Sequence, residues 1–223
     1  LATYTASSPW CSAQLSAAHT AQAQDATTDI LEALRAENFA RALPLRPPAL
    51  DKSPRDYRLW TLRGMAHAGL SKPAAALVAY QRALKLAPTY LPALEGAAQI
   101  EYQQGSDRAK PLILRVLALR PADPTSHAML AVIDYKAKNC TEAVPHFQQA
   151  EALLKAQPPL LAEYASCLAT LSRYEEAIPI LQQVLKTDPT RQSARYNLAL
   201  AQWSANHTQD ALVTLQPLIE TNP

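Results

Sequence analysis

Glycine, charge and long apolar runs are all scarce in this chain. Only 4 of its 223 residues are glycine, 18% are charged, and the net charge is +2. Such a small net charge excludes a strong electrostatic attraction to nucleic acid or to a membrane surface. No apolar run approaches the roughly 20 residues of a transmembrane helix. Alanine, leucine, glutamine and glutamate are abundant instead, and this composition predicts an all-α fold.

Cysteine is also scarce. The three cysteines, Cys11, Cys140 and Cys167, lack the spacing of a metal site. Free cysteine is among the most buried residue types, so we expect Cys140 and Cys167 to pack as small apolar groups. A disulfide between these two residues is the alternative.

Patterns of catalysis are missing as well. The sequence contains no G-x-S-x-G, no phosphate-binding loop and no H-E-x-x-H. The histidines are scattered along the chain, at His19, His67, His127, His146 and His207. We therefore predict no enzyme: no catalytic residue, no metal site and no cofactor.

Residues 1–24 contain no Asp, Glu, Lys or Arg and are rich in Ala, Ser, Thr and Gln. Ala21-Gln22-Ala23 fits the small-residue pattern of a cleavage site. Two interpretations stay open, the remnant of a bacterial export signal and a disordered tail. The first predicts an exported or periplasmic protein, and the second a cytoplasmic one.

The rest of the chain repeats itself with a period of about 34 residues. One series of alanines marks this period, at Ala42, Ala76, Ala109, Ala143, Ala177 and Ala211. A second series of small residues precedes the later alanines by 12 residues, or by 11 in the third repeat, at Gly64, Ala98, Ala131, Ala165 and Ala199. Small residues let two helices approach closely, so each repeat is predicted to be a pair of packed helices.

A buried stripe is predicted on each second helix. Bulky residues follow the anchor alanine by four positions, at Tyr80, Ile113, Phe147, Leu181 and Leu215. Small or apolar residues follow it by seven positions, at Ala49, Ala83, Val116, Ala150, Val184 and Leu218. Offsets of four and seven share one helix face. Helix pairs of this size complete their core by stacking on their neighbours.

Caps and prolines indicate where the second helices begin and end. Ser172 and Glu175 have capping-box spacing, as have Asn139 with Glu142 and Asn206 with Gln209. Prolines close most repeats, at Pro54, Pro88, Pro121, Pro189 and Pro223. The fourth repeat reaches Pro158, which predicts a longer second helix there.

One proline lies inside a predicted helix, within YEEAIPILQQVLKTDP of residues 174–189. Pro179 stands two residues after its anchor, like Pro44, Pro111 and Pro145 in other repeats. This position is off the buried stripe, so its lost hydrogen bond can be replaced by water. We therefore predict a continuous second helix with a mild bend.

The period, the anchor alanines, Trp60 with Gly64, Tyr80 or Phe147, and the closing prolines resemble tetratricopeptide repeats (TPR). The resemblance covers residues 25–223 and implies an α-α superhelix, a TPR solenoid of about six helix-turn-helix repeats. The implied segments are a tail at 1–24, a degenerate first repeat at 25–56, and repeats two to six at 57–90, 91–123, 124–157, 158–191 and 192–223, forming a single solenoid domain. Repeat three lacks one residue, and only Trp60 fills the tryptophan position of the family.

The resemblance implies a non-enzymatic scaffold that binds a partner peptide or protein segment in a concave groove. In the family, first helices line this groove one, four and five residues after their small residue. With Tyr196, one turn earlier, the predicted groove residues are Met65, Gln99, Tyr102, Gln103, Val132, Tyr135, Lys136, Ser166, Leu200 and Trp203. The same positions also hold Ala68, Gly69, Ala169, Thr170 and Ser204. The alternative is that these side chains only pack between neighbouring first helices.

The partner is expected to be a protein or peptide. Lys136 is the one cation among the groove positions, so the two-lysine clamp that binds acidic chaperone C-termini is absent. The closing prolines and the near-neutral charge argue against an RNA-reading repeat protein, so no nucleic acid is predicted. A second interpretation is a regulatory or substrate-docking region of a larger enzyme or assembly factor. Leu215, Leu218 and Ile219 predict an apolar end on the last repeat, where end-to-end association or a partner is expected.

Overall fold

A computed structural model describes residues 28, 32–33, 35–36, 38–42 and 53–221, which form helices and no strand. The all-α prediction is confirmed. The predicted tail at 1–24 and most of the first repeat, with Pro44 and Ala49, lie outside the described residues. The chain packs as two compact bodies that divide between Leu112 and Ile113. None of the helices described is both long enough and apolar enough to span a membrane.

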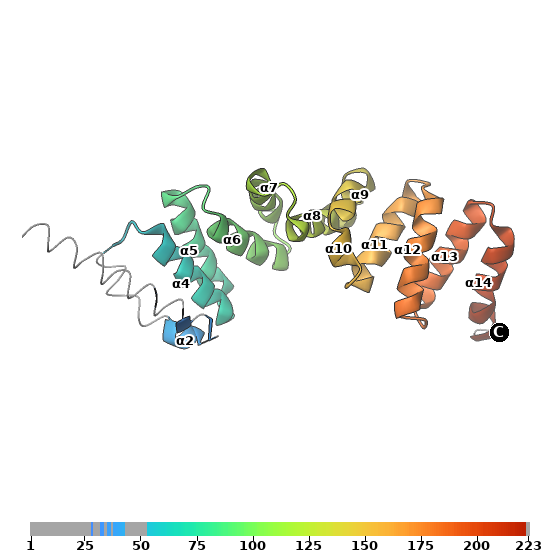
Figure 1. Ribbon diagram of the computed structural model, residues 1–223, viewed down its shortest axis with the longest axis horizontal. Helices are drawn as coiled ribbons and strands as arrows, with labels where there is room; N and C mark the ends of the chain where they lie inside the picture. Colours follow the sequence, from blue (N-terminus) through green and yellow to red (C-terminus); the bar gives the residue numbers. More distant parts are fainter. Residues whose placement is uncertain (1–27, 29–31, 34, 37, 43–52, 222–223) are drawn as a thin grey trace, which may run out of the picture. The chain divides into compact units, whose positions relative to one another are not determined.

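The N-terminal body contains α2 (Phe39–Ala42), α4 (Tyr57–Gly69), α5 (Pro73–Leu86), α6 (Leu91–Gln103) and the start of α7 (Ala109–Leu119) (Figure 1). The buried ring of Tyr80 on α5 lies against Gly64 of α4 and Gly96 of α6. A methyl group at Gly64 would come within 2.5 Å of Tyr80 Cε1. These two glycines therefore make room for the ring, and burial raises the pKa of Tyr80 to about 12.

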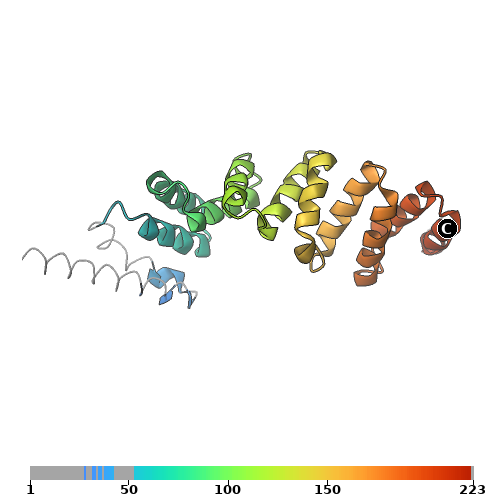
Figure 2. The same cartoon turned by 45° about the horizontal axis from the view of Figure 1, so that its top comes forward.

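The C-terminal body contains the rest of α7, α8 (Pro124–Lys136), α9 (Cys140–Gln149), α10 (Glu151–Leu154), α11 (Pro158–Thr170), α12 (Tyr174–Thr187), α13 (Gln192–Ser204) and α14 (Thr208–Thr221). From α11 to α14 the helices lie side by side in chain order (Figures 1 and 2). One continuous core joins Ala128 to Ala201 and includes the stacked rings of Phe147 and Tyr164.

The two series of small residues lie inside these cores. Every anchor alanine is buried, and so is every small residue of the first helices. The bulky residues Tyr80, Ile113, Phe147 and Leu181 are buried as predicted, and Leu215 in the last repeat is half-buried. The periodic pattern of the sequence thus marks where the helices touch.

The turns between paired helices correct the predicted caps. Each first helix is followed by one residue in the left-handed backbone conformation, with φ between 56° and 67°. These residues are Ser71, Gly105, Lys138, Ser172 and Asn206. In repeat five the Ser172 amide donates to Ala169 O and the next amide to Leu168 O, and the other four turns show the same pair of bonds. Ser172 therefore ends α11 and does not cap α12. Asn139 does precede α9, but its side chain makes no capping bond.

The second helices continue through their internal prolines, as predicted. The helix α12 runs unbroken through Pro179, α9 contains Pro145, and both prolines are exposed. The predicted long second helix of repeat four is wrong, because α9 ends at Gln149 and the short helix α10 follows. Ala150, where the two helices meet, is fully buried.

Covalent and polar links join neighbouring helices of the C-terminal body. Cys140 of α9 and Cys167 of α11 form a disulfide, so the expectation of two free, apolar cysteines is wrong and the alternative holds. His127 Nε2 of α8 donates to Pro121 O at 2.8 Å, since a carbonyl oxygen can only accept. His127 Nδ1 and His146 Nδ1 share a hydrogen bond of 2.9 Å, which joins α8 to α9.

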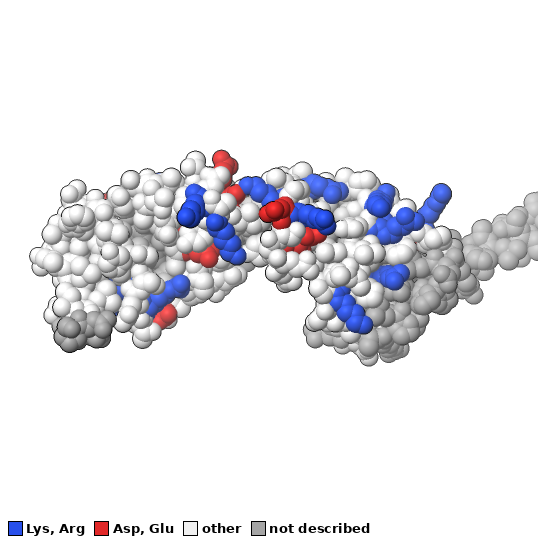
Figure 3. All heavy atoms as spheres, turned by 180° about the vertical axis from the view of Figure 1, so that it is seen from behind, with Lys and Arg blue, Asp and Glu red and all other residues white. Residues whose placement is uncertain are grey.

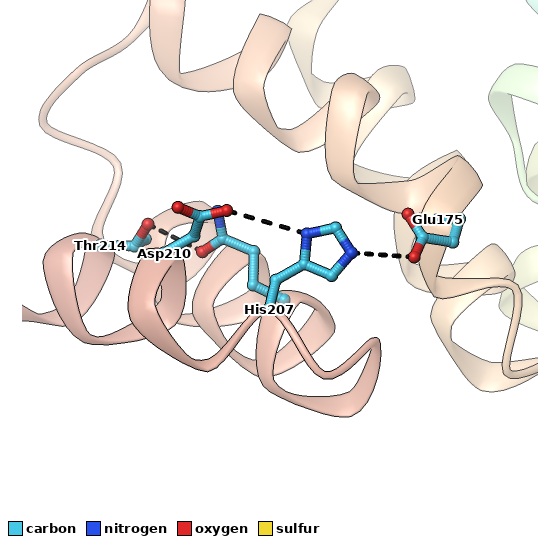
Figure 4. Close-up of polar contacts among 5 residues, drawn as sticks. Glu175, His207, Asp210 and Thr214 are labelled. Atoms are coloured by element: carbon cyan, nitrogen blue, oxygen red, sulfur yellow. Dashed lines mark hydrogen bonds and ion pairs between the residues drawn. The ribbon is translucent and has the colours of Figure 1, made fainter.

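A third link connects repeats five and six. His207, just before α14, lies between two carboxylates (Figure 4). Its Nε2 is 3.0 Å from Glu175 Oε1 of α12, and its Nδ1 is 3.7 Å from Asp210 Oδ2. Nearby, the Thr214 hydroxyl of α14 donates to Gln202 Oε1 of α13. Polar contacts thus supplement apolar packing between these repeats.

Candidate functional site

A hollow of about 350 Å³ lies between the first helices α11 and α13 of the C-terminal body. Its lining comes from α11, the start and middle of α12, and α13: Ala165, Ser166, Ala169, Thr170, Tyr174, Leu181, Asn197, Leu200, Ala201 and Ser204. The volume falls within the range of sites that take a small ligand or a few side chains of a peptide.

Ala169 lines the hollow at a position where three other repeats carry an aromatic residue. Ala169 lies four residues after its small residue, the position of Tyr102, Tyr135 and Trp203. Tyr135 of α8 is half-buried and packs against the core. Ala169 leaves the corresponding space between α11 and α13 open.

The floor and the walls of the hollow differ in polarity. Ala165, Leu181 and Ala201 form a buried apolar floor. Hydroxyl and amide groups stand around it, from Ser166, Thr170, Tyr174, Asn197 and Ser204. The Thr170 hydroxyl donates to Ser166 O at 2.9 Å and keeps its lone pairs available as acceptors. An apolar floor with a polar rim suits a ligand that carries both apolar side chains and amides.

Large apolar side chains stand beside the hollow on α13. Tyr196, Leu200 and Trp203 are 57%, 46% and 63% exposed. Their spacing of four and seven residues places them on one helix face. Aromatic groups in this position bury a large area when a partner covers them.

The predicted groove residues separate into three groups. Ser166 and Leu200 line the hollow, and Tyr196 and Trp203 are exposed on the same helix as Leu200. The second group belongs to the N-terminal body and comprises Met65, Gln99, Tyr102 and Gln103. Of these four side chains, Gln103 is exposed and the other three are partly buried. The remaining three come from α8: Val132, Tyr135 and Lys136.

The prediction that Val132 lines the groove is wrong. The residue is 4% exposed and packs between helices, as the alternative interpretation has it, so it cannot line an open groove. Tyr135 is half-buried against the same core, and Lys136 is exposed. The sequence prediction also missed Tyr174 and Leu181, because it took all lining residues from first helices.

Glu163 is the one charged residue of α11, and its side chain is partly buried. Burial raises its pKa, while Lys136 and Arg191 oppose that rise. Among the described residues its Oε2 atom has no hydrogen-bond partner. In the part of the chain that the structure describes, no three His, Cys, Asp or Glu side chains are placed to hold a metal ion.

Comparisons with known proteins bear on the fold. A family model described as tetratricopeptide repeat matches residues 6–190, and a second with the same description matches residues 168–223. No curated protein matches the chain.

Several solved structures are similar. YrrB, a TPR protein with an unusual peptide-binding site, shares 21% identity over 79% of this chain and 91% of its own, with a TM-score of 0.66. PilF of Pseudomonas aeruginosa shares 16% over 92% and 94%, with a TM-score of 0.62. The MamA protein shares 15% over 74% and 90%, with a TM-score of 0.60. At these identities the likeness shows the fold alone.

Proposed function

The chain belongs to the tetratricopeptide repeat family, and on that premise we propose that it binds a peptide or protein segment in the hollow between α11 and α13. The observation that carries the proposal is the open space over the apolar floor of Ala165, Leu181 and Ala201. The same position in repeat four is filled by Tyr135. The structural similarity to YrrB, a TPR protein with an unusual peptide-binding site, supports this class of ligand.

The ligand is a segment with at least one bulky apolar side chain. That side chain occupies the apolar floor, where its burial provides most of the binding free energy. The peptide amides bond to Ser166, Thr170, Asn197 and Ser204, which fixes the direction of the segment. Trp203 and Tyr196 contact its neighbouring residues.

Filling the hollow tests this proposal. Ala169→Tyr copies the aromatic residue of repeat four, so the protein should fold while losing the space. Peptides selected on the wild-type protein from a displayed random library should bind Ala169→Tyr at least about tenfold more weakly, a loss of ~1.4 kcal/mol or more. Fluorescence anisotropy of labelled peptides gives the affinities.

The matched control is Ala118→Tyr, which adds the same side chain at an exposed position of α7 in the same body. It should bind the selected peptides like the wild type. Trp203→Ala should weaken binding as well. Unchanged affinity of a folded Ala169→Tyr protein would show that the ligand lies elsewhere.

The disulfide supports the exported interpretation of residues 1–24. Disulfides form and persist in oxidising compartments and are rare in the cytosol. Cys140 and Cys167 are both buried, so their bond is shielded from solution reductants. Maleimide labelling under denaturing conditions, on protein taken directly from its cells, should leave these two cysteines unlabelled until a reductant is added. Labelling of the denatured protein without reductant would favour the cytoplasm. A regulatory region of a larger enzyme or assembly factor stays the second prediction for function.

A further inference from the structure

Two histidines of repeat four face each other where α8 packs on α9. His127 Nδ1 and His146 Nδ1 are 2.9 Å apart, and the centroids of the two rings are 5.1 Å apart. The lone pair of an unprotonated imidazole nitrogen is the commonest metal ligand in proteins. The contact therefore brings two potential metal ligands into one gap between neighbouring helices.

The ring of His127 is fixed in the orientation that a metal-binding histidine needs. Its Nε2 donates to Pro121 O at 2.8 Å, and the residue is buried, with 8% of its surface exposed. A histidine that ligates a metal almost always donates its other ring N–H to a carbonyl or a carboxylate, which fixes the tautomer and the ring orientation. With its proton on Nε2, a neutral His127 presents the lone pair of Nδ1 toward His146.

The spacing of the two nitrogens fits a metal ion that holds them at a right angle. A metal–imidazole bond is about 2.0–2.1 Å long, so two bonds at a right angle hold their nitrogens about 2.9 Å apart, and two bonds at the tetrahedral angle about 3.3 Å apart. The observed 2.9 Å matches the right angle. Square-planar nitrogen ligation is typical of Cu²⁺ and Ni²⁺, and Cu²⁺ binds most tightly among the divalent first-row metals.

One ring must turn before a metal ion can take the place of the shared proton. In the hydrogen bond the two nitrogens point at each other, whereas two ligands of one ion both point at the ion. His146 is half-buried, so its ring can turn while His127 stays bonded to Pro121 O. Water completes the coordination, because no three His, Cys, Asp or Glu side chains among the described residues are placed to hold a metal ion.

The charges near the pair favour a cation. Glu142 is exposed, precedes His146 by one helical turn and is the only Asp, Glu, Lys or Arg of α9. Arg120, next to Pro121, is paired with Asp123 at 3.2 Å. On the face of the molecule drawn in Figure 3, most acidic side chains lie beside Lys or Arg, which oppose the binding of a cation. Carboxylates on that face are therefore weak competitors for a metal ion.

We propose that His127 and His146 form a binding site for a divalent transition metal, with Cu²⁺ as the preferred ion. The ion replaces the proton between the two Nδ1 atoms, which is released to solution, and joins α8 to α9 as the disulfide joins α9 to α11. The two histidines lie 19 residues apart, so their spacing in the sequence did not predict a metal site. The hollow is lined from α11, α12 and α13, so the two sites are separate.

Titration of the protein with CuCl₂ tests the proposal. All proteins carry Cys11→Ser, because a thiol at that position would itself bind copper. Calorimetry at about pH 7.5 should show one ion bound per chain with a Kd below about 100 μM. The affinity should fall below about pH 6, where protons compete for the imidazole nitrogens. Electron paramagnetic resonance of the Cu²⁺ complex should show two nitrogen ligands.

Three histidines give the variants and their control. His146→Gln removes one ligand at a half-buried position and should weaken Cu²⁺ binding at least about tenfold, a loss of ~1.4 kcal/mol or more. His127→Gln should do the same, and His146→Gln still decides if the change at the buried position unfolds the protein. His207→Gln is the matched control, because this histidine of the same body lies between Glu175 and Asp210. It should bind Cu²⁺ like the parent protein. Circular dichroism checks that the variants fold.

Three results would overturn the proposal: no saturable binding of Cu²⁺, equal binding by His146→Gln and the parent protein, or equal losses in His146→Gln and His207→Gln. Binding of Zn²⁺ as tight as that of Cu²⁺ would overturn the right-angled geometry. A spectrum with two nitrogen ligands that persists in His146→Gln would place the ion elsewhere.

Discussion

At the scale of single residues, Glu163 gives the chain a predictable response to pH. Burial raises the pKa of Glu163 in the folded protein. A group of this kind favours folding below its unfolded-state pKa, and the benefit is lost as pH rises through the folded pKa. At neutral pH the buried charge therefore opposes folding.

Glu163→Gln should raise the melting temperature at pH 7 and change it little near pH 4, where the carboxyl is protonated in the wild type. Because the side chain is only partly buried, the gain at pH 7 should stay below about 1 kcal/mol. Thermal unfolding followed by circular dichroism at both pH values measures it, with the exposed Glu142→Gln as control. A lower melting temperature at pH 7 would mean that attraction by Lys136 and Arg191 outweighs burial.

Residue partners were harder to predict from the sequence than residue burial. The small and bulky periodic positions were found because burial follows helix periodicity. The disulfide was only an alternative, because Cys140 and Cys167 lie 27 residues apart in different repeats and their contact depends on how α9 meets α11. The His127–His146 pair and the hollow over Ala169 depend on the same packing.

At the scale of elements, the helices could be predicted and the turns only in part. Ser and Asn favour both helix caps and left-handed turn positions, so composition alone could not separate the two. The backbone decides, since Ser172 and Asn206 have φ of 59° and 67°. Repeat four shows the limit most clearly, because Lys138 holds the turn position that the sequence suggested for Asn139.

The turns predict opposite effects for two substitutions. Gly105→Ala should destabilise the protein by about 1 kcal/mol, because a Cβ atom disfavours left-handed backbone. The glycine has no other atom within 4 Å of where the Cβ would lie, so the backbone alone sets this cost. Lys138→Gly removes a Cβ from the same conformation and should stabilise by up to ~1 kcal/mol. Midpoints of urea unfolding measure both changes. A loss of stability in Lys138→Gly would show that its backbone is not strained.

At the scale of the whole molecule, the sequence predicted the family because the period and the anchor alanines recur along the entire described chain. It did not predict two compact bodies, since the pattern continues through the boundary between Leu112 and Ile113. The groove was predicted as a line of equivalent positions, whereas the hollow lies at one place where the repeats differ.

The disulfide should stabilise one body and leave the other unchanged. It closes a loop of 27 residues in the C-terminal body, which corresponds to about 3–4 kcal/mol of loop entropy in the unfolded chain. Reduction, or replacement of both Cys140 and Cys167 by alanine, should lower the calorimetric transition of that body and spare the transition of the N-terminal body. Equal shifts of both transitions would show that the two bodies unfold together.

The same disulfide has a mechanical consequence. A chain pulled from its two ends lengthens as each repeat unfolds. The segment inside a disulfide-closed loop cannot extend, because the force passes through the disulfide. Because the bonded cysteines are separated by 27 positions in the sequence, roughly 90 Å of chain length cannot be extended until the sulfur–sulfur bond is broken. Under a pulling force, repeats four and five would thus stay covalently linked. The chain between Cys140 and Cys167 would add nothing to the length of the stretched protein.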